Sequence, residues 1–187
     1  METDWDKRYR EGFYDGADEA HELVGKFSRL MPPGKAVIDI AMGNGRDLIF
    51  LAGKGFPVYG LEKSEEAIKL AREAAQKEHR QLTVIRGDAY SLPFKAGVAG
   101  CVLVFYFLAR EIMEELTELL APGGILIYET FLKRQNSLDR PRDPRYLLDD
   151  GELLGYFGCL DLLSYEETVL DAGGKLRAVA RYTGRKR

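Results

Sequence analysis

Three acidic side chains and a glycine-rich turn are the residues of this sequence best suited to chemistry. Asp39 stands at the end of an apolar run that begins at Ala36, and Gly43 and Gly45 follow it. Glycine adopts positive φ angles and has no Cβ, so a ligand can approach its backbone closely. The helix expected next, residues 46–53, presents unpaired N–H groups and the positive end of its dipole. This combination is typical of a nucleotide-binding turn.

The spacing within the turn narrows the choice of nucleotide. A dinucleotide fingerprint, G-x-G-x-x-G, needs a third glycine where this chain has Leu48. The sequence contains no G-x-x-x-x-G-K-[ST], which excludes a P-loop. A nicotinamide-dependent oxidoreductase stays an alternative, although Leu48 in place of the third glycine and the lack of a histidine relay disfavour it.

Two further acids end the next two expected strands. Glu62 closes the apolar run that begins at Pro57. Its distance along the chain from the glycines is close to the roughly 20 residues expected of an acid that binds ribose hydroxyls. Asp88 follows the run 82–86. The competing interpretations are a charge at a helix start for Glu62 and an ordinary turn residue for Asp88. Ser64 has the character of an N-cap, which explains the two glutamates after it better than it explains Glu62.

These residues carry a family resemblance. The motif Asp39-x-Ala41-x-Gly43-x-Gly45 resembles the first motif of class I S-adenosylmethionine-dependent methyltransferases, D-x-G-x-G-x-G, with alanine in place of one glycine. A helix, Pro-Gly-Gly and an apolar strand over 110–130 are a late signature of the same family. The segment 146–167 resembles the end of the tellurite-resistance-type methyltransferases, small bacterial enzymes that act on chalcogen oxyanions or small thiols.

The resemblance implies S-adenosyl-L-methionine as the cofactor and assigns roles to the turn and the acids. The two glycines would approach the methionine moiety, and the first acid would orient the turn and the amino end. The second acid would hold the ribose and the third the adenine. The full set of expected cofactor-binding residues is Asp39, Ala41, Gly43, Gly45, Glu62, Lys63, Asp88, Ala89 and Phe105.

The acceptor side is less marked in the sequence. A W-x-x-x-Y segment of the type formed by Trp5 and Tyr9 covers the cofactor in the resembled family, whereas the competing interpretation is simple capping of the core. The basic loop 131–148 is either an anion-attracting segment or a solvated face. The candidate acceptor-side residues are Tyr9, Tyr14, Arg110 and Glu129.

The expected reaction is methyl transfer to a small-molecule acceptor, such as a thiol or a chalcogen oxyanion. The sulfonium activates the methyl group, so alignment of the acceptor supplies much of the catalysis, worth about 7–11 kcal/mol in well-oriented systems. No dedicated nucleophile is therefore expected. A cofactor-binding protein without turnover is the second alternative.

The elements that must position these residues alternate along the chain. Strands are expected at 36–40, 57–62, 82–86, 101–107 and 124–130, and helices at 19–29, 46–53, 64–78, 110–120 and 149–157. Residues 160–170 and 175–183 alternate around a glycine turn, as a hairpin does. This pattern predicts an α/β fold with a Rossmann-like, doubly wound, mostly parallel sheet that ends in an antiparallel hairpin, the seven-stranded methyltransferase fold.

The length predicts one domain over residues 1–187. Its segments are an N-terminal cap (1–34), a cofactor-binding core (35–130), and an acceptor-side part (131–187) with a loop, a short helix and the hairpin.

Composition agrees with an ordinary globular chain. Of its 187 residues 45% are hydrophobic, and the net charge of −3 argues against a nonspecific nucleic-acid binder. No apolar run approaches the roughly 20 residues that cross a bilayer, and the charged N-terminus lacks the features of a signal peptide, so a cytoplasmic location is expected. Cys101 and Cys159 are expected to be buried free thiols, and the two histidines form no metal cluster.

Overall fold

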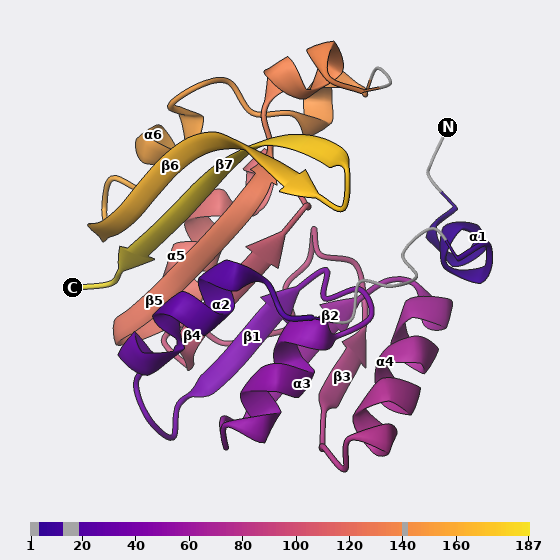
Figure 1. Ribbon diagram of the computed structural model, residues 1–187. Helices are drawn as coiled ribbons and strands as arrows, with labels where there is room; N and C mark the ends of the chain where they lie inside the picture. The colour runs from indigo at the N-terminus through magenta and orange to yellow at the C-terminus, as the bar shows by residue number, and fades with distance from the viewer. Residues whose placement is uncertain (1–3, 13–18, 140–141) are drawn as a thin grey trace. The chain divides into compact units, whose positions relative to one another are not determined.

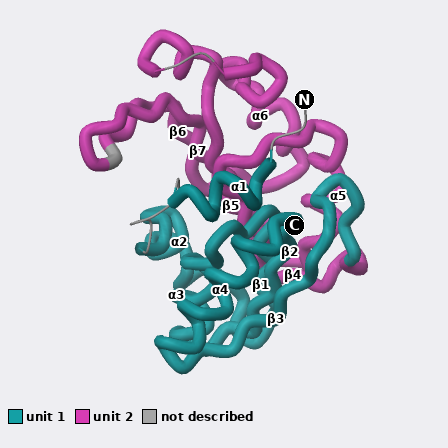
Figure 2. Tube along the Cα trace, turned by 90° about the vertical axis from the view of Figure 1, so that its right-hand side faces the viewer, with its two compact units in different colours: residues 1–93 teal, residues 94–187 magenta. Residues whose placement is uncertain are grey.

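The computed structural model describes residues 4–12, 19–139 and 142–187. It divides into two compact units, residues 1–93 and 94–187, which Figure 2 colours separately. Each unit has its own paired strands and its own helices. The expectation of one domain with three consecutive segments stays a prediction.

The first unit has three parallel strands in the order β3-β2-β1, with Asp39 opposite Gly60 and Glu62 opposite Arg86. Helix α4 packs along α1 and α3 (Figure 1). The α4 residues that face inward are small or branched and buried, which gives the helix one apolar face. The elements are α1 (Trp5–Arg10), α2 (Glu22–Phe27), the 3₁₀ turn Ser28–Leu30, β1 (Ala36–Ile40), α3 (Arg46–Gly53), β2 (Val58–Glu62), α4 (Glu65–Lys77) and β3 (Thr83–Arg86).

The second unit has four strands in the order β4-β5-β7-β6. Strands β4 and β5 are parallel, whereas β7 runs antiparallel to both β5 and β6. Every residue of β4 is buried, as expected of a central strand covered on both faces. The elements are β4 (Ala99–Phe105), α5 (Met113–Leu119), β5 (Leu120–Phe131), α6 (Glu152–Tyr156), β6 (Asp161–Ala172), β7 (Lys175–Arg185) and the 3₁₀ turns Arg110–Ile112, Lys133–Ser137 and Pro144–Tyr146.

The strand directions confirm the predicted α/β class with a parallel core and a terminal antiparallel hairpin. Strand β1 and helix α3 have the predicted bounds, and Ser64 caps α4 by accepting a hydrogen bond from the Ala67 N–H at 3.1 Å. Strand β4 begins two residues earlier than predicted, and it also ends two residues earlier because Tyr106 turns the chain with a φ of 54°.

Two further expectations differ from the structure. The first N-terminal helix was expected from residue 19, but α2 begins at Glu22, since the His21 backbone is extended and its N–H donates to Asp47. The expectation of two buried thiols is wrong for Cys159, which is exposed in the turn between α6 and β6; Cys101 is buried, and both are free. Within the described residues, no helix has the length and apolar character to cross a membrane.

Candidate functional site

The turn after β1 is built from left-handed backbone. Ala41, Gly43 and Gly45 have φ angles of 58°, 57° and 72°. The chain thereby reverses between β1 and α3 in the few residues available. Glycine adopts this conformation freely, but a Cβ costs about 1–2 kcal/mol there. The alanine that replaces the motif's glycine therefore stores strain at the centre of the predicted site.

The two glycines of the turn face different surroundings. A Cβ on Gly43 would lie 2.7 Å from the Tyr9 hydroxyl, so this backbone faces helix α1. A Cβ on Gly45 would lie 3.0 Å from the Ala71 Cβ, so Gly45 serves the packing of the turn on α4. Tyr9, an acceptor-side candidate, thus lies against the glycine turn, whereas Tyr14 lies outside the described residues.

The Glu62 carboxylate holds the turn and the end of β2 together. Its Oε2 accepts a hydrogen bond from the Gly43 N–H at 2.9 Å. Its Oε1 accepts from the N–H groups of Lys63 at 2.9 Å and Ser64 at 2.8 Å. Only 8% of the residue is exposed, and this burial raises the pKa of Glu62, whereas the three N–H groups lower it. A carboxylate has about four lone-pair sites, so one site remains to accept from a ligand hydroxyl.

The Asp39 carboxylate lies deeper and has weaker support. The residue is 3% exposed, and none of the described residues donates a hydrogen bond to its carboxylate. Burial raises the pKa of Asp39 well above its ordinary value; the charges of Asp47 and Glu62 raise it further, and Arg46 opposes them. A buried acid without a donor is costly in the ligand-free chain, and it suits the binding of a cationic group.

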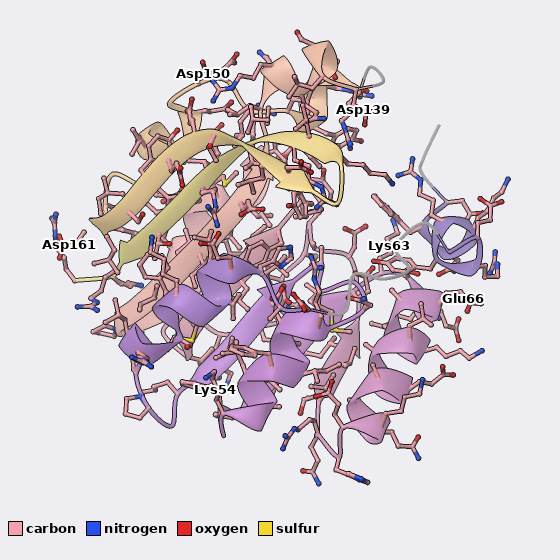
Figure 3. All side chains as sticks on the ribbon, viewed as in Figure 1. Lys54, Lys63, Glu66, Asp139, Asp150 and Asp161 are labelled. Atoms are coloured by element: carbon pink, nitrogen blue, oxygen red, sulfur yellow. The ribbon has the colours of Figure 1, made fainter. Side chains whose placement is uncertain are left out.

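The expected adenine-side residues lie at the neighbouring strand end. The Gly87 N–H donates to the Glu62 carbonyl at 3.0 Å, which brings the residues after β3 beside the end of β2. Asp88 accepts from the Tyr90 N–H and pairs with Lys63 at 3.2 Å. Both contacts lower the pKa of Asp88. Figure 3 labels Lys63. Ala89, the other expected cofactor-binding residue after β3, is 7% exposed.

Helix α1 is tied to the same strand end by a residue absent from the sequence-based set. The Asp6 carboxylate accepts from the Ser64 hydroxyl at 2.6 Å and from the Glu66 N–H at 3.2 Å, and these bonds lower its pKa. Arg10 pairs with Glu66, which Figure 3 labels in the first turn of α4. Hydrogen bonds therefore run from α1 through Ser64 and Glu62 to Gly43. The signal in the sequence was the N-cap serine, Ser64, two residues after Glu62.

The remaining candidates lie in the second unit. Phe105 ends β4 and is 8% exposed. Glu129 is buried in β5 and accepts from the Arg181 Nε at 3.1 Å. Burial and a hydrogen bond with Glu129 raise the pKa of Tyr106 to about 12, so its phenol stays protonated at neutral pH and serves as a donor.

The Arg110 guanidinium is engaged in hydrogen bonds within the protein. Its Nε and Nη2 donate to the Glu152 carboxylate at 2.6 and 3.0 Å. Its Nη1 and Nη2 also donate to the carbonyls of Arg145 and Leu147. The hydrogen bonds with Glu152 raise the pKa of Arg110. Arg110 thus holds the segment that leads into α6, and its acceptor contact stays a prediction.

Comparison with known proteins agrees with this geometry. Residues 37–124 match the family model described as a methyltransferase domain. Hemagglutinin 1 of Eikenella corrodens is 26% identical over 165 residues, which cover 82% of this chain and 53% of that protein. A tRNA (carboxymethyluridine(34)-5-O)-methyltransferase of Xenopus tropicalis is 30% identical over 121 residues, 60% of this chain and 18% of that protein. The chain thus spans about half, or less, of the length of these relatives.

Solved structures share the fold. TehB from Haemophilus influenzae has a TM-score of 0.78 at 18% identity and covers 97% of this chain, which covers 67% of TehB. A structure titled for the conversion of a disulfide into a thioacetal in echinomycin biosynthesis has a TM-score of 0.75 at 20% identity. The match covers 97% of this chain and 90% of that protein. A third structure is geranyl diphosphate C-methyltransferase from Streptomyces coelicolor A3(2) in complex with Mg²⁺, geranyl diphosphate and S-adenosyl-L-homocysteine. It has a TM-score of 0.65 at 12% identity, and the match covers 88% of this chain and 77% of that protein. The chain therefore has the fold of these methyltransferases, and its residues 37–124 match a methyltransferase domain.

Proposed function

We propose that this chain is a methyltransferase that transfers the methyl group of S-adenosyl-L-methionine to a small-molecule acceptor, a thiol or a chalcogen oxyanion. The observation that carries the proposal is the bond from the Gly43 N–H to the Glu62 carboxylate, with Asp88 and Asp39 beside it. It joins the glycine turn, which is suited to a methionine moiety, to the acid suited to ribose hydroxyls.

The residues fit the cofactor in charge and in shape. Glu62 has one acceptor site left for a ribose hydroxyl, and Asp88 lies at the next strand end for the adenine amino group. Asp39 supplies a buried negative charge for the ammonium group of the methionine end. When bound, the cofactor supplies an electrophilic methyl group on a sulfonium.

In the chain, the Gly43 backbone, Glu62 and Asp39 would hold the cofactor and fix its orientation. An acceptor aligned with the sulfonium methyl group would receive it, and the electron pair of the broken carbon–sulfur bond would stay on the cofactor's sulfur. A thiolate acceptor needs no proton transfer at that moment. Tyr106 is protonated at neutral pH, so any role it has beside Glu129 is that of a hydrogen-bond donor.

The acceptor class is tested with a labelled-methyl assay on the full chain. Small thiols, tellurite and selenite, phenols and amines are offered separately, together with unmodified tRNA because one relative is a tRNA methyltransferase. Label transfer to a thiol or an oxyanion supports the proposal. Transfer to tRNA alone would replace the acceptor class, and binding of S-adenosylhomocysteine without transfer to any acceptor would favour the cofactor-binding protein without turnover.

A further inference from the structure

A buried histidine–aspartate pair lies beside the glycine turn and was not among the expected site residues. Asp47, in the first turn of α3, is 3% exposed. Its Oδ1 accepts from the His21 backbone N–H and its Oδ2 contacts the His21 Nδ1, both at 2.7 Å. This two-point contact fixes the imidazole ring just before α2. The orientation of the ring, and with it the position of its second nitrogen, Nε2, is therefore defined.

The contact with Asp47 determines which nitrogen of the His21 ring donates and which accepts a hydrogen bond. Because Nδ1 donates to the carboxylate, the neutral ring carries its lone pair on Nε2. The Arg46 Nη2 makes a hydrogen bond with that Nε2. The guanidinium is therefore held by a neutral acceptor, and its charge is not neutralised there.

Arg46 keeps guanidinium N–H donors that could bind an anion. It is half-buried at the first residue of α3, directly after Gly45. Throughout residues 4–12, 19–139 and 142–187, no carboxylate lies within ion-pair distance of its guanidinium. An arginine has five N–H donors in a planar fork, and His21 occupies one of them. The others remain for an anion.

Arg46 and Asp39 act on the same small region. The positive charge of Arg46 lowers the pKa of Asp39, which places the guanidinium within electrostatic reach of that buried acid. The glycine turn lies between them in the sequence. Among the described residues, Asp39 is a buried acid without a hydrogen-bond donor and Arg46 is a cation without an acid, and they flank the glycine turn in the sequence. Together they match the two charges of an α-amino acid zwitterion.

We propose that Arg46 binds the α-carboxylate of the cofactor's methionine end and that the His21–Asp47 pair is its positioning device. This inference rests on the proposed function and adds the ligand group that Arg46 recognises. Guanidinium and carboxylate form paired N–H···O bonds, which lysine cannot reproduce as a point charge. Asp39 then faces the α-ammonium group of the same ligand.

The test compares two ligands that differ only at the amino-acid end. S-adenosylhomocysteine carries the zwitterion, whereas 5′-methylthioadenosine has the same adenosyl thioether and lacks it. Affinities are measured by calorimetry with the full chain and with Arg46→Gln and Arg46→Lys. We expect Arg46→Gln to weaken S-adenosylhomocysteine binding by about 10–100-fold, the loss of one charge-assisted contact, and to leave 5′-methylthioadenosine within about twofold. Arg46→Lys is expected to fall between.

The outcomes separate this inference from the proposed function. If the unaltered chain binds neither ligand, the proposed function fails. If it binds S-adenosylhomocysteine and Arg46→Gln weakens both ligands equally, or neither, the role of Arg46 is overturned while the proposed function stands.

The role of His21 has its own readout. His21→Leu removes the acceptor for Arg46, and His21→Gln restores a carbonyl oxygen near the position of Nε2. We expect His21→Leu to reduce the preference for S-adenosylhomocysteine over 5′-methylthioadenosine by about 3–10-fold, with partial recovery in His21→Gln. A purely structural His21 would lower the melting temperature and leave that preference unchanged, which would contradict the positioning role.

Discussion

The hydrogen bonds of Glu62 allow the effect of one substitution to be worked out in detail. Its three backbone donors need acceptors, and its last lone pair is assigned to the ribose. In Glu62→Gln the amide oxygen can still accept from Lys63 and Ser64, but the amide NH₂ then faces the Gly43 N–H, donor against donor. The turn loses its tie, and the ligand loses a charged acceptor.

The expected magnitude follows from that loss. A hydrogen bond to a charged group is worth about 1.5–3 kcal/mol, which corresponds to an affinity loss of about 10–100-fold. Glu62→Ala is expected to reach at least the same loss and to leave three N–H groups without their acceptor. Unlike Arg46→Gln, Glu62→Gln is expected to weaken S-adenosylhomocysteine and 5′-methylthioadenosine alike, because both carry the ribose.

The assay is calorimetric titration, with Glu65→Gln as the matched control. Glu65 lies three residues away, and its side chain is 71% exposed and paired with Arg86. The control should bind both ligands as the unaltered chain does. A folded Glu62→Gln variant with unchanged affinity for S-adenosylhomocysteine would refute the ribose role of this acid.

Three further predictions concern stability. Ala41→Gly relieves a left-handed alanine, so we expect a gain of about 1 kcal/mol, or about 2–4 °C in melting temperature; an unchanged or lower value would contradict the strain. Burial raises the pKa of Asp39 above its ordinary value of 3.8. Between the ordinary and the raised pKa the folded chain binds more protons than the unfolded chain, so the free energy of unfolding falls as the pH rises through this range. Asp39→Asn should therefore flatten this pH dependence in urea titrations and stabilise the ligand-free chain by about 1 kcal/mol at neutral pH, while weakening S-adenosylhomocysteine binding; a destabilised variant would show that the carboxylate is well paired. Arg110→Ala removes the contacts to Glu152 and two carbonyls, so we expect a cost of about 1–3 kcal/mol in urea unfolding and unchanged cofactor affinity, whereas a lost affinity at full stability would give Arg110 a ligand role.

Local patterns predicted most of the fold. Strand β1 and helix α3 follow from an apolar run, a glycine turn and an amphipathic stretch, all within neighbouring residues, and the structure has them at the predicted bounds. The meeting of Gly43 with Glu62 was also predictable, because the carboxyl ends of adjacent parallel strands lie at one edge. The predicted roles of these residues in binding stay predictions.

Long-range pairing explains what the sequence could not reveal. Asp47 in a first helical turn has an adequate local explanation as a helix-dipole charge, so nothing in the sequence indicates its bond to His21. Arg110 starts a helical turn, and its partner Glu152 lies far along the chain. Cys159 was expected to be buried from its apolar neighbours, but it lies in a turn that exposes its side chain.

The most direct measurement is a crystal structure of the full chain with S-adenosylhomocysteine. We expect the ribose hydroxyls to lie within hydrogen-bonding distance of the Glu62 carboxylate, with the adenine beside Asp88 and the methionine end over the turn at Gly43. An adenosyl group bound elsewhere on the chain, or a ribose turned away from Glu62, would contradict this expectation.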